Sequence, residues 1–181
     1  MKGVLFKRTL LLFMVIVLLA GILLLGAYSY FGRRTYINLE LESLDTVLRT
    51  ATEMYQSQPT DRDTYTSAIK FISSTADVRF YCFFYKDTGL IEFSTNILDY
   101  NNDYIQAVQF GILDGQTIRK DSLKLNKSTN AIAVGGPLCN AKGECEGGII
   151  FVRAIQHIDA AFHQLNSALW VLALCTVPLI L

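Results

Sequence analysis

The sequence has few of the residue types on which metal centres and many enzymes depend. Its 181 residues include two histidines, His157 and His163, and four cysteines. On a helix, a separation of six residues turns the histidines about 240° apart, so they do not share a face. Asp159 and His163 stand at i and i+4 and could offer two ligands to a metal, but no third ligand is evident. A solvated helix face is the expected interpretation, with no metal and no cofactor.

Motifs for catalysis and for nucleic-acid binding are also missing. The sequence has no Gly-x-Ser-x-Gly, no phosphate-binding loop and no dinucleotide fingerprint. No cysteine or serine has a nearby histidine and a third orienting group. Residues 32–166 carry a net charge of −3 and no basic patch with interleaved aromatics. We therefore expect no enzyme activity in this chain and no nucleic-acid partner.

Charge is missing from a long stretch near the N-terminus. From Thr9 to Phe31 the sequence has 23 residues without a charged side chain, which as a helix would span about 35 Å and cross a bilayer. A cleaved signal peptide would have a shorter apolar core, and Ala27-Tyr-Ser29 fits a cleavage site poorly. We expect a retained transmembrane helix at residues 9–31. Basic residues before it favour a cytoplasmic N-terminus at residues 1–8: Lys2, Lys7 and Arg8.

The last 15 residues, Ser167 to Leu181, are uncharged as well. They reach only about 22 Å as a helix, and a helix that ended inside the hydrocarbon would leave its last carbonyl groups unsatisfied. We interpret residues 167–181 as the start of a second transmembrane helix that is cut off, so that the chain is the front part of a longer, multi-pass protein of the cell membrane. Residues 32–166 then form an extracytoplasmic domain. The alternative is a short tail that lies at the membrane interface or packs on the first helix.

Apolar residues recur at alternating steps of four and three between Ile37 and Tyr55, a heptad-like pattern that predicts a helix. No proline or glycine interrupts the sequence from Arg33 to Gln58, so this helix can continue directly from the membrane helix. Two interpretations stay open: a homodimer seam that carries motion into the membrane, or an amphipathic helix that lies on the sheet of its own domain. The stripe comprises Ile37, Leu41, Leu44, Leu48, Ala51 and Tyr55.

The rest of the segment predicts a mixture of helices and strands. Pro59 stops the long helix, Thr60 resembles an N-cap, and apolar residues from Tyr65 to Ala76 predict a second helix. Aromatic and β-branched runs then predict strands. The order indicates an α+β fold with an antiparallel sheet of about five strands. Strands are predicted at residues 78–85, 90–95, 116–123, 131–138 and 146–153, a short helix at 102–112, and a last helix from Gln156.

Two segments together carry a family resemblance. In FYCFFYKDTGLIEFST, a strand, an Asp-x-Gly turn and a second strand follow a pair of helices. In AIAVGGPLCNAKGECEGGIIFVRAIQHI, a strand ends in Gly-Pro-Leu, and after a polar turn Gly-Gly-Ile-Ile-Phe-Val leads into a helix. This layout resembles the extracytoplasmic PAS-like (Cache, or PDC) sensor domain of bacterial two-component histidine kinases over nearly the whole chain. Chemoreceptors and membrane-bound cyclic-dinucleotide enzymes use similar domains.

The resemblance implies signal input. The domain would detect an extracytoplasmic stimulus and pass it through the membrane helices to a cytoplasmic kinase core that this chain does not contain. The sensor of a chemoreceptor or of a cyclic-dinucleotide enzyme is one alternative. Another, from a different class, is a short two-helix accessory or structural membrane protein that ends at Leu181.

The strand VRFYCFFY offers candidate ligand contacts. Its period of two puts Val78 and every second residue to Phe84 on one face, which we expect to pack under the long helix. The other face combines a cation with tyrosines and suits a small anion, because arginine binds carboxylates bidentately. Similar domains bind small organic acids, amino acids or cations there. Alternatively, Arg79 pairs with Asp77 or Glu92, the tyrosines belong to the core edge, and the stimulus is a partner protein. The candidate contacts are Arg79, Tyr81, Phe83 and Tyr85, with Lys120, Asn130 and Arg153.

Cys139 and Cys145 stand six positions apart around a polar turn. A zinc site needs four ligands, usually with closer spacing and a second pair, but Cys82 lies in a predicted strand and Cys175 in a predicted membrane helix. Oxidising surroundings outside the cytoplasm favour a disulfide, and facing Cα atoms of a hairpin, about 4.5–5.5 Å apart, are within its reach. We expect a disulfide that staples the turn; redox sensing is the alternative.

Overall fold

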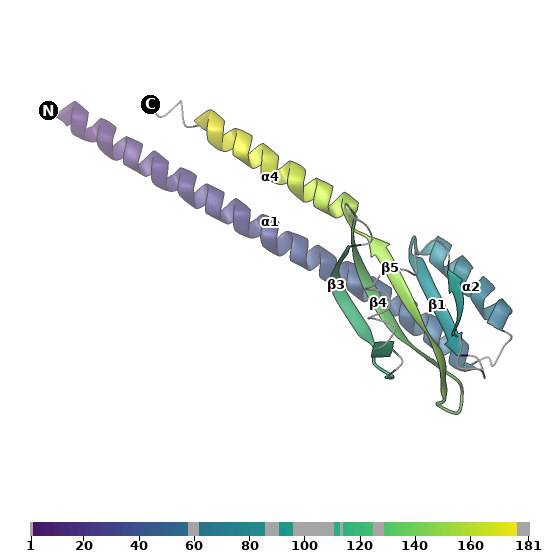
Figure 1. The fold of residues 1–181 in the computed structure, drawn as a ribbon. Coiled ribbons are helices and arrows are strands. Elements are labelled where there is room, and N and C mark those ends of the chain that lie inside the picture. The colour runs from purple at the N-terminus through teal and green to yellow at the C-terminus, as the bar shows by residue number, and fades with distance from the viewer. Residues whose placement is uncertain are drawn as a thin grey trace. The chain divides into compact units, whose positions relative to one another are not determined.

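A computed structural model gives the fold of the chain and describes residues 2–57, 62–85, 91–95, 111–112, 114–124 and 129–176. The chain divides into two compact units. The helical unit consists of Met1–Tyr36 and His157–Leu181, and the sheet unit consists of Ile37–Gln156. The sheet unit lies within the predicted extracytoplasmic domain and contains every described strand (Figure 1).

Helix α1 (Lys2–Ser57) contributes to both units. It continues without a break past the end of the predicted membrane helix, because the first proline of the sequence is Pro59. Its apolar side chains between Leu10 and Leu25 are largely exposed. By length and composition, α1 is the one described helix that could cross a membrane, and the predicted span at residues 9–31 lies within it.

Helix α4 (Gln156–Thr176) approaches α1 closely inside the helical unit. Arg33 donates two hydrogen bonds to one carboxylate oxygen of Asp159, from Nε at 3.0 Å and from Nη2 at 2.8 Å. A Cβ on Gly32 would lie 3.3 Å from the ring of Phe162. The ion pair and this close contact hold the two helices together one turn beyond the predicted membrane span.

The predicted second transmembrane helix, residues 167–181, is helical as far as Thr176. Residues 177–181 lie outside the part of the chain that the structure describes. Passage of this segment through a membrane therefore stays a prediction.

Five strands form one antiparallel sheet with the order β2-β1-β5-β4-β3, which confirms the predicted α+β fold. Strand β5 is central, with β1 on one side and β4 on the other. Of the predicted short helix, residues 111–112 are helical and residues 102–110 lie outside the described residues, as do Pro59 and Thr60. The strands are β1 (Arg79–Tyr85), β2 (Ile91–Thr95), β3 (Ile118–Lys124), β4 (Asn130–Cys139) and β5 (Cys145–Ala154).

One face of the sheet, which we call the helix face, is covered by α1 (Figure 1). Every residue of the predicted stripe from Ile37 to Tyr55 is at most 6% exposed. Leu48 reaches the sheet where β4 lacks a side chain: a Cβ on Gly136 would lie 3.4 Å from it. Packing on the chain's own sheet is thus the observed use of the stripe. A homodimer seam on α1 would need the outward side of the helix.

Helix α2 (Arg62–Thr75) lies on the helix face beside β1. The ring of Tyr65 meets the rings of Tyr55 and Phe84 edge to face, with centroids 5.0 Å and 6.3 Å away. The hydroxyl of Tyr65 donates to the carbonyl of Ala51 at 3.1 Å. The prediction that the Phe84 side of β1 packs under the long helix is confirmed, and α2 shares that side.

The other face of the sheet, which we call the opposite face, has a core of its own. Its residues come from β1, β3, β4 and β5 together with Ile112, and each is at most 4% exposed. This second core explains why the central strands are apolar on both sides. Its members are Tyr81, Phe83, Ile112, Leu123, Ala131, Ala133, Ile150 and Val152, with Ile118 partly buried beside them.

The turn between α2 and β1 depends on Asp77, which has a φ of 51°. The amide of Val78 donates to the carbonyl of Ser73 at 3.0 Å, as in helix ends that close through a left-handed residue. Aspartate tolerates this conformation better than most residues because its short polar side chain can form local hydrogen bonds. Asp77 therefore ends α2 and directs the chain into β1.

Replacing Asp77 by valine tests this turn. A β-branched residue is poorly compatible with positive φ, so we expect Asp77→Val to lower the free energy of unfolding by about 1–2 kcal/mol. Urea unfolding of the detergent-solubilised chain measures the change. Asp77→Asn is the matched control and should unfold like the wild type; equal stability of the valine variant would contradict the left-handed turn.

Candidate functional site

The predicted ligand-contact strand delivers its aromatic side chains to the opposite-face core. Tyr81 and Phe83 are almost completely buried, with ring centroids 5.9 Å apart. Gly148 of β5 is paired with Phe83. A Cβ at position 148 would collide with the ring of Phe83 and the side chain of Ile112. Tyr81 and Phe83 therefore belong to the core of this face.

Two basic residues lie at the ends of one row across the same face. Arg79 pairs with Val152, Val152 with Ala133, and Ala133 with Lys120. Arg79 and Lys120 are exposed, whereas the two residues between them are buried. At about 4.8 Å per strand, the two basic positions are about 14 Å apart along the backbone. The row across the opposite face thus consists of two buried apolar residues with an exposed cation at each end.

Charged groups near Arg79 and Tyr85 affect how Arg79 can pair and how Tyr85 titrates. Among the described residues no carboxylate forms an ion pair with Arg79, Asp77 included; the side chain of Glu92, the other predicted partner, lies outside the description. Tyr85 is half-buried. Burial and, next, the negative charge of Asp114 raise the pKa of the Tyr85 hydroxyl. A cation and an acid are thus both present near β1.

Arg153, another predicted contact, does not lie on this face of the sheet. Side chains alternate along a strand, and Val152 belongs to the opposite-face core, which turns Arg153 to the helix face. The same alternation separates Asn130 from the candidate contacts, because its neighbour Ala131 lies in the opposite-face core. The sheet itself therefore divides the predicted contacts into two sets.

On the helix face, Arg153 is the centre of a polar junction. Its Nη1 donates to Glu40 Oε2 and, at 3.4 Å, to Ser43 Oγ, both on α1. Its Nη2 donates to the carbonyl of Ala76 at 2.7 Å. The side chains of Arg153 and Glu40 are only 16% and 19% exposed. We call these four residues the Arg153 junction; it ties β5 to α1 and to the end of α2.

The charge of Arg153 suits this place for a second reason. Ala76 directly follows the last residue of α2, where the helix dipole is negative and a carbonyl lacks its helical partner. A guanidinium there satisfies the carbonyl and the carboxylate of Glu40 at once, since its donors point in fixed, separate directions. The chain then reaches Gln156, the first residue of α4, after two more residues.

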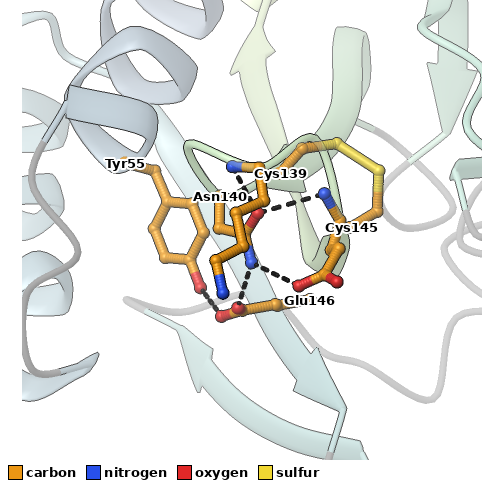
Figure 2. Close-up of a disulfide and its surroundings, with 7 residues drawn as sticks. Tyr55, Cys139, Asn140, Cys145 and Glu146 are labelled. Atoms are coloured by element: carbon orange, nitrogen blue, oxygen red, sulfur yellow. Dashed lines mark hydrogen bonds between the residues drawn. A yellow bond between two sulfur atoms is a disulfide. The ribbon is translucent and has the colours of Figure 1, made fainter.

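Figure 2 shows the turn between β4 and β5, where Cys139 and Cys145 form a disulfide. Asn140 organises the turn from inside. Its Oδ1 accepts hydrogen bonds from the amides of Lys142 at 2.9 Å and Glu144 at 3.1 Å. An asparagine that bonds to amides two and four residues later is typical turn chemistry. We call this set of bonds the Asn140 bracket.

The Asn140 bracket continues into α1 through Glu146. Asn140 Nδ2 donates to one carboxylate oxygen of Glu146 at 2.8 Å, and the hydroxyl of Tyr55 donates to the other at 2.6 Å (Figure 2). The bonds from Tyr55 and then Asn140 lower the pKa of Glu146 below its usual 4.5. Burial, followed by the bond to Glu146, raises the pKa of Tyr55. At neutral pH the pair is therefore a carboxylate and a neutral phenol.

Some of the residues in these two polar clusters were not among the sequence candidates. Nothing local in the sequence indicates that Glu40 bonds to Arg153 or that Glu146 bonds to Tyr55, because these partners lie 113 and 91 positions away. Asn140 had a detectable signal, because asparagine at the start of a polar turn is a common turn former. His157 and His163 are exposed on α4, and Asp159 bonds to Arg33. Among the described residues, no group of three histidine, cysteine or acidic side chains could hold a metal ion.

No protein-family model matches the sequence, and no curated protein matches it. Solved structures do. The ligand-binding domain of the Pseudomonas aeruginosa PAO1 amino acid chemoreceptor PctC, in complex with GABA, is similar with a TM-score of 0.50 and 11% identity, over 75% of this chain and 62% of that one. This chain shares the fold of that chemoreceptor domain. The fold expected from the sequence is thereby confirmed.

Two further structures are similar. The periplasmic sensory domain of the Campylobacter jejuni chemoreceptor Tlp1 has a TM-score of 0.48 and 16% identity, over 75% of this chain and 59% of that one. The extracellular domain of mmHK1S-Z2, a protein designated a histidine kinase, has a TM-score of 0.49 and 14% identity, over 76% and 63%. The chain spans about three fifths of each of these three domains.

Removing Arg153 tests the junction. We expect Arg153→Ala to lower the free energy of unfolding by about 1–3 kcal/mol, because Glu40 and the Ala76 carbonyl lose their donor in a largely buried place. Urea unfolding of the chain in detergent measures this. Arg49→Ala is the control: its pair with Glu53 spans 4.0 Å with side chains 71% and 65% exposed, and its loss should change stability by less than about 0.5 kcal/mol. Equal effects would mean that the junction adds no stability.

Proposed function

We propose that this chain is the signal-input region of a membrane-bound sensor. Its sheet unit would detect a small molecule outside the cytoplasm and pass the signal through membrane helices to a cytoplasmic output module. The observation that carries the proposal is the double role of β5. The strand supplies Ile150 and Val152 to the opposite face and Arg153 to the junction with α1 and α2.

The adjacency of these residues suggests how a signal would travel. Val152 lies between Arg79 and Lys120 in the row across the opposite face, and Arg153 is the next residue. A ligand that shifts β5 at Val152 would therefore act on the Arg153 junction, and so on α1, without crossing any loop. Only Ala154 and Ile155 separate Arg153 from α4, so the same shift would reach both membrane-directed helices.

The ligand class that fits best is a small organic acid or amino acid. An exposed guanidinium can hold a carboxylate through two parallel hydrogen bonds, and Arg79 and Lys120 are both exposed on this face. The acid Asp114 near Tyr85 would favour a ligand that also carries an ammonium group. The PctC domain, whose fold this chain shares, was solved with GABA, a molecule of this kind.

For the parent protein, we propose a histidine kinase that spans the membrane more than once and works as a homodimer. The histidine-kinase resemblance of the sequence supports the output module, and a chemoreceptor or cyclic-dinucleotide enzyme is the alternative. The homodimer would use the outward side of α1, because the predicted stripe is buried against the sheet. No catalytic role is proposed for the chain itself.

A ligand screen with paired variants tests the input role. The chain in detergent is heated with amino acids (GABA included), small carboxylates and divalent ions, and a ligand at 100 times its dissociation constant should stabilise it by about 2.7 kcal/mol. Arg79→Ala should abolish the shift in unfolding temperature, and Arg49→Ala, on α1, should retain it. A shift that survives Arg79→Ala would rule out the proposed contact.

The gene beyond Leu181 tests the output. A linker followed by a kinase core with a phospho-accepting histidine would support the kinase proposal. A methyl-accepting signalling domain or a cyclic-dinucleotide domain would replace the output and keep the sensor. A stop codon after Leu181 would contradict the receptor proposal and favour a two-helix accessory protein.

A further inference from the structure

The β4–β5 turn lies where a solvent-borne thiol can reach it. Cys145 is exposed and Cys139 half-buried. Cys82, on the helix-face side of β1, is a free cysteine and fully buried, and burial strongly raises its pKa. Accessible disulfides tend to be the reducible ones, whereas a buried thiol that stays protonated is a poor nucleophile. Among the cysteines whose side chains the structure describes, reduction would thus affect Cys139 and Cys145, with no disulfide exchange to Cys82.

The disulfide encloses the Asn140 bracket. Besides the bonds to Asn140 Oδ1, the amide of Asn140 donates to the carbonyl of Glu144 at 2.9 Å and the amide of Gly143 donates to the carbonyl of Asn140 at 2.9 Å. Gly143 has a φ of 81°, which closes the turn. All these groups lie between the two cysteines, so the covalent link holds the conformation in which Asn140 can reach Glu146.

Glu146, the residue after Cys145, connects the turn to α1. Its carboxylate is positioned by Asn140 on one oxygen and bonds to Tyr55 through the other. Tyr55 is buried in the last turns of α1, beside the rings of Tyr65 and Phe84. In the described part of the chain, the Tyr55 hydroxyl donates its hydrogen bond to Glu146. The turn therefore anchors the end of the same helix that carries the Arg153 junction.

We propose that the Cys139–Cys145 disulfide is a redox-responsive latch, which controls through Asn140, Glu146 and Tyr55 how firmly the last turns of α1 are attached to the sheet. It would give the sensor an input separate from any ligand on the opposite face. A purely structural disulfide would also close the turn. In the latch, reduction of the disulfide loosens the attachment of the end of α1 to the sheet as well as the turn.

The chemistry requires a dithiol outside the cytoplasm, either a small molecule or a dithiol oxidoreductase. One of its thiolates attacks a sulfur of the disulfide, Cys145 being the exposed side, and forms a mixed disulfide while Cys139 leaves as a thiolate and takes up a proton. The second thiolate of the reductant then releases Cys145. Two electrons and two protons reach the pair, and the reductant becomes a disulfide. Without the link, the turn is held by hydrogen bonds alone, each of modest net strength.

Amide hydrogen exchange on the whole chain in lipid nanodiscs tests the latch, with and without dithiothreitol and with alkylation to count thiols. Reduction should expose two additional thiols and speed exchange over residues 52–57 by about tenfold, as local opening becomes easier. Strand β3, whose pairing with β4 runs from Asn130 to Gly135, is the internal control and should not change. The double variant Cys139→Ser/Cys145→Ser should behave like the reduced wild type and ignore dithiothreitol.

Tyr55→Phe identifies the route and needs no change at the cysteines. With the disulfide intact, this variant should already exchange quickly over residues 52–57, and reduction should add less than about a twofold change. Three results would overturn the latch: free thiols with unchanged exchange over residues 52–57, a Tyr55→Phe variant that still responds like the wild type, or a disulfide that dithiothreitol cannot reduce. None of these involves a ligand, so a failed ligand screen and a failed latch are distinguishable.

Discussion

Burial of one stripe of α1 against the sheet is the constraint on which the sheet unit depends. The stripe from Ile37 to Tyr55 is nearly inaccessible to solvent, and burying one such aliphatic side chain contributes about 1.5–3 kcal/mol. An exposed ion pair on the same helix, such as Arg49 with Glu53, contributes at most about 1 kcal/mol. Apolar burial therefore decides where α1 lies, and the polar contacts decide how it is oriented and held.

Those polar contacts lie at both ends of the buried stripe. Glu40 joins Arg153 near the beginning of the stripe, and Tyr55 joins Glu146 at its end. Both partners belong to β5, the central strand of the sheet. One strand thus holds one helix at two points that are 15 residues apart on the helix, about 22 Å along its axis. When the strand is displaced, a helix fixed to it at two such points can move as a single unit.

The strand β5 also explains why the two faces of the sheet are not independent. Ile150 and Val152 belong to the opposite-face core, while Arg153 bonds on the helix face. Close packing makes such a strand stiff, and a residue on one face cannot shift without its neighbour on the other. The opposite face of the sheet and the helix packed on the helix face can therefore be coupled by covalent adjacency alone.

Much of the fold could be predicted because its signals are local. The alternating strands, the heptad-like stripe and the uninterrupted helix to Ser57 follow from side-chain periodicity and from the absence of proline, and the cysteine spacing at a turn indicated the disulfide. The candidate site was less predictable. The period of two correctly placed Phe84 and Tyr81 on opposite faces of β1. It could not reveal that Tyr81 and Phe83 are buried as well, because the Ile112 and β3 residues of their core are distant in the sequence.

The sequence by itself determined which residues form helices and strands, which side of each is apolar, and that one long stretch suits a membrane. Tertiary structure alone decided that the α1 stripe faces the chain's own sheet, that Arg153 turns away from Arg79, and that Glu40 and Glu146 find partners on distant elements. The physical reason is range. Propensity and periodicity act over a few neighbouring residues, whereas an ion pair across 113 positions exists only after the strands have paired in one register.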